Sequence, residues 1–84
     1  MGWSVYILKC SDDSLYTGIT TDINRRITEH NAKTGAKSLY GKLPVHLVYI
    51  EKSINQKTAV KREGEIKGWL REKKINLVKG SPQQ

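Results

Sequence analysis

The sequence lacks most features of a secreted or membrane-embedded protein. Cys10 is its only cysteine, which excludes an internal disulfide and a cysteine metal cluster. No segment approaches the roughly 20 apolar residues that a membrane-spanning helix needs, and the first residues do not resemble a secretory signal. Tyr6 stands where a myristoylation signal has Ser or Thr, which argues against a lipid anchor. We therefore expect a cytoplasmic protein.

Acidic residues are also scarce. Eight acidic residues stand against 15 lysines and arginines, so the formal net charge is +7. Such an excess favours nucleic acid or another anionic partner, although small proteins are also basic for solubility alone. The 84 residues suffice for one domain with a modest core, which we place at about 3–78 with a tail over 79–84.

Alternating apolar residues predict an α+β domain with a three-stranded antiparallel sheet flanked by helices. Two strands over 3–10 and 15–20 flank the turn-forming "SDDS", which indicates a hairpin. The third strand, over 45–52, is mostly apolar, and we expect it to be covered on both faces.

Side-chain alternation predicts which residues of the hairpin share a face. Matching the more apolar faces of the two strands brings Tyr6 and Tyr16 together, beside Gly18. This register requires an odd-length loop or a bulge at the turn.

Helical periodicity and capping residues predict two helices after the hairpin. The first helix covers 23–32, has Asp22 or Thr21 as N-cap and stops before Gly35. A basic connection over 32–44 follows, with one helical turn around 36–40. The second, long helix covers 55–74, and a short apolar return covers 75–78.

Two adjacent arginines differ in their position on the first helix. At 100° per residue, Arg26 lies 60° from Ile23 and Arg25 lies 160° away. Arg26 and His30 therefore border the apolar stripe, and Arg25 faces solvent. An arginine at a core edge can also simply cover apolar surface, and a lone histidine or a tyrosine on a sheet can be ordinary core.

A glutamate falls inside the apolar stripe of the second helix. Glu63 lies 40° from Ala59 on the helical wheel, whereas Glu65 lies outside the stripe. A carboxylate in such a place must be paired, protonated or bound to a cation. The competing interpretation is an ordinary ion pair with Lys67, one helical turn away.

Together these residue types suit the hydrolysis of a phosphodiester. The reaction needs an activated water, positive charge on the phosphoryl oxygens and stabilisation of the departing oxygen. Arginine meets the second need, and Mg²⁺ held by one carboxylate and several waters meets the third. A tyrosine or a histidine could accept the proton, and no Gly-rich phosphate loop or Ser-His-Asp signature points to another chemistry.

The segment "SVYILKCSDDSLYTG" resembles the two-part signature of the GIY-YIG nuclease superfamily. The later segments "TDINRRITEHN" and "AVKREGEIKGWLREKK" resemble its small stand-alone bacterial members, and the likeness covers about residues 3–78. The superfamily includes excision-repair, homing and restriction nucleases and structure-specific resolvases. Its fold is a small antiparallel sheet flanked by helices, which agrees with the prediction above.

The resemblance implies a role for each candidate residue. Tyr6 and Tyr16 match the two motif tyrosines, one of which acts as base or water-positioner. Arg26 matches the family arginine that contacts the scissile phosphate. His30 matches a position at which members of the family carry His or Tyr. Glu63 matches the single metal-binding glutamate, which would bind Mg²⁺ or Mn²⁺ weakly.

Two departures from the family pattern bear on catalysis. Ser4 replaces the first glycine of the signature, and Ile19 stands where some repair members carry a lysine. A tyrosine base, with an ordinary pKa near 10, would then need help from the metal or from Lys9.

The resemblance implies a Mg²⁺-dependent endonuclease acting on branched, nicked or damaged DNA in repair or recombination, and leaves open RNA as substrate. Such members are usually joined to a DNA-binding domain that these 84 residues do not include, so a protein partner could supply specificity. The alternatives are a non-catalytic nucleic-acid-binding module and an adaptor for a partner enzyme. The residues expected to contact backbone phosphates are Arg25, Lys33, Lys37 and Lys42.

Overall fold

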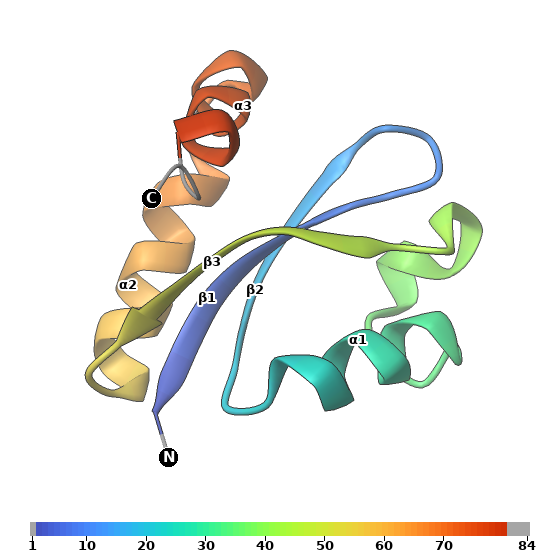
Figure 1. The fold of residues 1–84 in the computed structure, drawn as a ribbon, viewed down its shortest axis with the longest axis horizontal. Coiled ribbons are helices and arrows are strands. Elements are labelled where there is room, and N and C mark those ends of the chain that lie inside the picture. The colour runs from blue at the N-terminus through green and yellow to red at the C-terminus, as the bar shows by residue number, and fades with distance from the viewer. Residues whose placement is uncertain (1, 81–84) are drawn as a thin grey trace.

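The computed structural model describes residues 2–80 as a three-stranded antiparallel sheet with helices on both faces (Figure 1). In chain order the elements are β1 (Trp3–Lys9), β2 (Leu15–Thr20), α1 (Ile23–Asn31), the 3-10 helix η1 (Lys37–Lys42), β3 (His46–Ser53), α2 (Gln56–Lys67) and α3 (Arg71–Gly80). The strand order is β2-β1-β3, which makes β1 the central strand. The predicted α+β fold is therefore confirmed.

The hairpin has the register that side-chain alternation predicts. Tyr6 pairs with Gly18 and Leu8 with Tyr16, so both tyrosines project from the same face. The connecting residues 10–14 are odd in number, and Asp13 adopts a left-handed conformation with φ 69°. The predicted odd-length loop is thus confirmed.

The central strand β1 is buried on both faces and divides the interior into two cores. α1 and η1 lie on one side of the sheet, and α2 and α3 lie on the other (Figure 1). The buried residues of the first core are Tyr6, Leu8, Cys10, Leu39 and Val45, and those of the second are Val5, Ile7, Ala59 and Ile66.

The expectation that the third strand is covered on both faces is wrong. β3 is an edge strand, and Leu47 and Ile50 remain exposed on it. An apolar run shows that a strand is hydrophobic but does not say whether it lies at the centre of a sheet. Here the central place belongs to β1.

The predicted long helix is broken at Gly68, and this part of the prediction is also wrong. α2 ends at Lys67, and the Gly68 N–H bonds back to carbonyls of the last turn. Glycine is the weakest helix former after proline, so a break there costs little. Leu70, placed in the apolar stripe by the wheel, is 82% exposed in the resulting corner.

The predicted apolar return over 75–78 is instead part of α3, where Leu77 and Val78 pack against the second core. Lys79 and Gly80, assigned to the tail, are the last residues of this helix, and the rest of the predicted tail lies outside the described residues. None of the helices within residues 2–80 is long and apolar enough to cross a membrane.

Candidate active site

Three aromatic rings from three different elements meet on the α1 side of the sheet. Tyr6 lies on β1, Tyr16 on β2 and His30 on α1. The ring centroids lie 6.4 Å apart for the two tyrosines, 6.3 Å for Tyr6 and His30, and 5.4 Å for Tyr16 and His30. The hairpin register and the last turn of α1 thus bring together three of the five residues that the sequence singled out.

A glycine makes room for the first tyrosine. Gly18 lies directly opposite Tyr6 in the hairpin, and a Cβ atom on Gly18 would lie 2.7 Å from Cζ of the tyrosine ring. Any side chain at this position would displace the ring. Sterics therefore explain why position 18 is a glycine, since the phenol of Tyr6 crosses the backbone there.

His30 is held through both of its ring nitrogens. Its Nδ1 accepts a hydrogen bond from the Ala36 backbone N–H at 3.2 Å, and its Nε2 lies 3.1 Å from the Tyr6 hydroxyl. A nitrogen that accepts a hydrogen bond carries no proton, so the network assigns the proton of the neutral ring to Nε2. His30 therefore donates to the Tyr6 oxygen, and it is 1% exposed.

A second glycine, Gly35, permits this arrangement, although its position in the sequence predicts only that the helix stops before it. A Cβ atom on Gly35 would lie 3.0 Å from Cα of His30 and would also collide with Nδ1 of the ring. Only a residue without a side chain lets the chain fold back closely enough for the Ala36 N–H to reach the imidazole. No local pattern in the sequence signals this contact, because it forms only when the chain folds back after α1.

The surroundings of these rings change their acidity. Burial, together with the charge of Arg26, holds the pKa of His30 below its ordinary value. Burial raises the pKa of Tyr6, although a hydrogen bond from Arg26 opposes this effect. At neutral pH, His30 is therefore neutral and Tyr6 keeps its proton.

Arg26 points toward the rings, and Arg25 does not. The side chain of Arg26 is 33% exposed and that of Arg25 is 63% exposed, so the predicted difference in position is confirmed. The guanidinium of Arg26 donates to Oε1 of Glu29 at 3.1 Å, and its interaction with Tyr6 lowers the pKa of that phenol. Burial alone would lower the pKa of Arg26, but its interactions with Glu29 and Tyr6 raise it, so the group remains charged.

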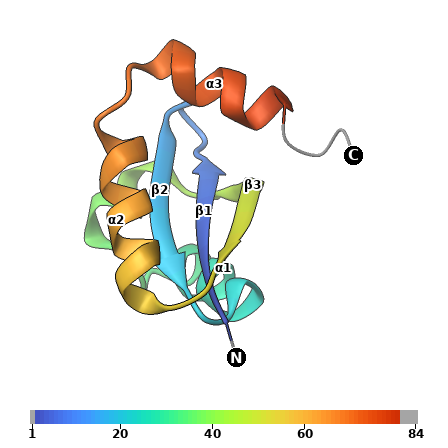
Figure 2. The same cartoon turned by 90° about the vertical axis from the view of Figure 1, so that its left-hand side faces the viewer.

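Glu63 lies on α2, which packs beside the edge strand β2 on the opposite side of the sheet from α1 (Figure 2). Its side chain is 21% exposed, against 51% for Glu65, as the helical wheel predicts. Its charge is one of the influences that raise the pKa of Tyr6, after burial and the neighbouring tyrosine. Its Oε2 lies 3.2 Å from Nζ of Lys67, so the ion pair considered as the competing interpretation also forms.

The acidic groups near the rings suit only a sparsely coordinated metal. No group of three or more His, Cys, Asp or Glu side chains within residues 2–80 could hold a metal ion. Glu63 would therefore be a single protein ligand. Mg²⁺ accepts this arrangement because it keeps several waters and binds substrate phosphate oxygens directly.

The remaining residues of the sequence prediction lie outside this cluster. Arg25 lies on α1, and Lys33, Lys37 and Lys42 lie on the connection that follows it, near or at the surface. Lys9 cannot assist a tyrosine, because it projects to the other face of the sheet and pairs with Asp13 at 3.4 Å. The neighbouring cation of Tyr6 is Arg26 instead.

Comparison with known proteins places the chain in a family. Residues 2–76 match the GIY-YIG catalytic domain. A UPF0213 protein of Haloquadratum walsbyi is 54% identical over 74 residues, which cover 88% of this chain and 83% of that protein. A UPF0213 protein of Staphylococcus aureus is 52% identical over 75 residues, which cover 89% of this chain and 92% of that protein.

Solved structures agree with these matches. The solution structure of a UPF0213 protein from Bacillus halodurans is 44% identical, with a TM-score of 0.61, and the match covers 98% of this chain and 89% of that one. A protein from E. faecalis is 38% identical, with a TM-score of 0.65, and the match covers 94% and 84% of the two chains. The chain therefore belongs to the GIY-YIG family, which is part of a superfamily of nucleases.

Proposed function

We propose that the protein hydrolyses phosphodiester bonds in DNA with the help of Mg²⁺ or Mn²⁺. The observation that carries the proposal is the position of Arg26: its guanidinium is close enough to Tyr6 to influence the pKa of the phenol, and the rings of Tyr16 and His30 lie beside Tyr6. A fixed cation next to ionisable hydroxyls is what an in-line attack on a phosphate needs.

Arg26 is the group that would bear the charge of the phosphoryl oxygens. A guanidinium stays protonated and presents donors in a plane that matches two phosphate oxygens. One of its nitrogens is bound to Glu29, so substrate binding would exchange or share this contact. The pairing with Glu29 holds the side chain in place before the substrate arrives.

Tyr16 is the better candidate for activating the attacking water. The hydroxyl of Tyr6 is already hydrogen-bonded to His30, its pKa is raised by burial, and its side chain is buried. Tyr16 is only partly buried and therefore more accessible to a water molecule. His30 would act as a positioning residue, because its Nε2–H fixes the phenol of Tyr6 and its Nδ1 is occupied by Ala36.

Glu63 would hold the divalent metal. When bound there, Mg²⁺ or Mn²⁺ would supply positive charge that stabilises the departing oxygen. Lys67 competes for one carboxylate oxygen of Glu63 in the absence of metal. Substrate phosphates and water would supply the other ligands.

The basic residues beside the cluster would bind the backbone of the substrate. Arg25, Lys33, Lys37 and Lys42 follow α1 and the connection to β3, and they would neutralise phosphates with little sequence preference. We propose branched, nicked or damaged DNA as substrate and a role in repair or recombination, with specificity supplied by a protein partner.

A second candidate function is nucleic-acid binding without cleavage. It is favoured by one observation: both Arg26 and Glu63 already have an oppositely charged partner on their own helix. A binding module would keep these pairs closed, whereas a nuclease must open them when substrate and metal bind.

The test is incubation of the protein with branched, nicked and flapped DNA, and with RNA of the same sequence, with and without Mg²⁺. Glu63→Gln removes the metal ligand, and Glu65→Gln is a matched control on the exposed side of α2. We expect Mg²⁺-dependent cleavage that survives in Glu65→Gln and is lost in Glu63→Gln. Binding of all substrates without any cleavage would contradict the nuclease and favour the binding module.

A further inference from the structure

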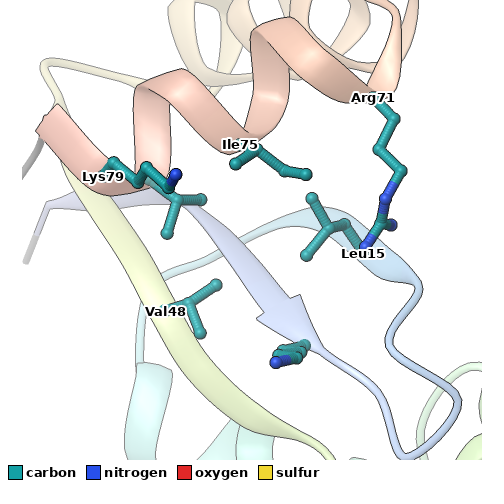
Figure 3. Close-up of a pocket in the computed structure, with 7 residues that line it drawn as sticks. Leu15, Val48, Arg71, Ile75 and Lys79 are labelled. Carbon is teal, nitrogen blue, oxygen red and sulfur yellow. The ribbon is translucent and has the colours of Figure 1, made fainter.

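An open cavity lies on the face of the sheet opposite the three rings, between α3 and the hairpin end of the sheet. Its volume is about 270 Å³. Figure 3 shows Ile75 on α3 projecting toward Leu15 and Val48, with Arg71 and Lys79 at opposite ends of the helix. The seven lining residues are Lys9, Leu15, Val48, Arg71, Ile75, Val78 and Lys79.

The floor of this cavity is aliphatic and incompletely covered. Leu15, Val48, Ile75 and Val78 are all only partly buried. Protein interiors are close-packed, so an apolar hollow of this size at the surface leaves area that an apolar group could still cover. None of the seven lining residues is aromatic, so the cavity offers no ring on which a nucleobase could stack.

Three basic side chains line the cavity, and one loop residue contacts two of them. The carbonyl of Asp13 accepts a hydrogen bond from the Arg71 guanidinium at 2.8 Å, and its carboxylate lies 3.4 Å from Nζ of Lys9. Asp13, which has a positive φ, therefore holds both cations at the mouth. None of the seven lining residues is acidic.

We propose that this cavity binds a small amphipathic anion, namely a short aliphatic chain that ends in a carboxylate or a phosphate. The aliphatic floor accommodates the chain, and the planar guanidinium of Arg71 matches either head group. The volume lies at the lower end of small-molecule sites, which limits the ligand to a short chain. The site is separate from the proposed nuclease centre, because Leu15 and Lys9 project from the opposite face to Tyr6.

NMR titration of the full chain with hexanoate and hexyl phosphate tests the proposal. Acetate and 1-hexanol are the controls, since acetate keeps the charged head group without the chain and 1-hexanol keeps the chain without the charge. We expect backbone shifts at Leu15, Val48 and Ile75 at concentrations of hexanoate or hexyl phosphate about tenfold lower than for either control. The ratio between the two probes identifies the preferred head group.

Two variants locate the binding site. Arg71→Gln removes the planar cation and should weaken hexanoate binding about tenfold, the typical effect of losing a hydrogen bond to a charged group. Arg25→Gln, on the other face of the molecule, should leave it unchanged. Ile75→Phe fills the cavity and should abolish the shifts. Its NMR spectrum also shows whether the variant folds. If it does not fold, Arg71→Gln still tests the site, because that change lies on the exposed rim.

Three outcomes would overturn the proposal. If 1-hexanol binds as well as hexanoate, the cavity is only an apolar crevice. If acetate binds as well as hexanoate, the cavity is only a charged surface. If a short DNA duplex displaces hexanoate and shifts the same residues, the cavity belongs to the nucleic-acid surface.

Discussion

The hydroxyl of Tyr6 lies 3.1 Å from Nε2 of His30, although the two residues are 24 positions apart in the chain. Both side chains are buried, and each occupies space that a glycine leaves free: Gly18 for the phenol and Gly35 for the imidazole. The Ala36 N–H fixes the other nitrogen of the imidazole. His30 therefore presents a proton, and not a lone pair, to the tyrosine.

This arrangement predicts how stability depends on pH. Because the pKa of His30 is lowered in the folded protein, the unfolded chain binds more protons between that value and about 6.5. Stability should therefore be complete above about pH 6.5 and should fall as pH decreases below it. Thermal unfolding at a series of pH values measures this effect, and an NMR titration of the ring gives the pKa directly.

The matched variant for this experiment is His30→Gln, which cannot titrate in this range. Its stability should lose the part of the pH dependence that His30 contributes. A histidine ring that titrates at or above about 6.5 in the folded protein would contradict the assigned network.

Replacing either of the two glycines next to the rings should destabilise the fold. Gly18→Ala and Gly35→Ala force a Cβ atom against Tyr6 and His30, and each should destabilise the fold by about 1–3 kcal/mol, as overpacking typically does. Gly64 is the control, since it lies inside α2 with open space around it. Gly64→Ala should stabilise the protein by about 0.5–1 kcal/mol.

Denaturant unfolding of the three variants measures these differences. If Gly35→Ala is as stable as the parent protein and keeps the low pKa of His30, the close approach at Gly35 does not hold the imidazole.

The ion pair on α2 should compete with the metal. Lys67→Gln removes the partner of Glu63, so Mn²⁺ should broaden the NMR signals around Glu63 and Tyr16 at concentrations up to about fivefold lower than in the parent. Lys61→Gln, an exposed change on the same helix, is the control. Broadening confined to the Asp12–Asp13 turn, or unaffected by Glu63→Gln, would show that the metal binds elsewhere.

Binding of DNA should depend steeply on salt. The logarithm of the affinity should fall with the logarithm of salt concentration by about 0.9 for each phosphate neutralised. Replacing Arg25, Lys33, Lys37 and Lys42 by Gln should reduce this slope, whereas replacing Lys57 and Lys61 on α2 should change it little. Fluorescence anisotropy with the Glu63→Gln protein separates binding from cleavage, and an affinity independent of salt would point to a different ligand.

Side-chain periodicity predicts the parts of this site that depend on single elements. Alternation along two strands places Tyr6 and Tyr16 on one face, and the helical wheel separates Arg26 from Arg25. These predictions succeed because a strand and a helix each have a fixed period. Capping preferences leave Asp22 or Thr21 as the N-cap, and the structure shows that it is Asp22, whose side chain accepts from the Arg25 N–H.

The parts that depend on tertiary packing could not be predicted in this way. The wheel continues the second helix through Gly68, but in the fold Trp69 turns back to pack on the second core, between Arg62 and Lys73. The contact between Gly35 and His30 arises only when the chain folds back after α1. The central position of β1 follows from the pairing of β3, which no local pattern specifies.

The most direct test of the proposed nuclease compares the two neighbouring arginines. Single-turnover cleavage of nicked or branched DNA with Mg²⁺ is measured for Arg25→Ala and Arg26→Ala, with thermal unfolding to verify that both variants fold. Arg26→Ala should lower the rate by about 10²-fold or more, as the loss of one preorganised donor to the transition state does, because its guanidinium lies at the rings. Arg25→Ala should weaken binding slightly and leave the rate nearly intact, because its side chain is mostly exposed. Equal cleavage by two folded variants would contradict the assignment of Arg26 to the reaction and leave it as a residue that covers the edge of the core.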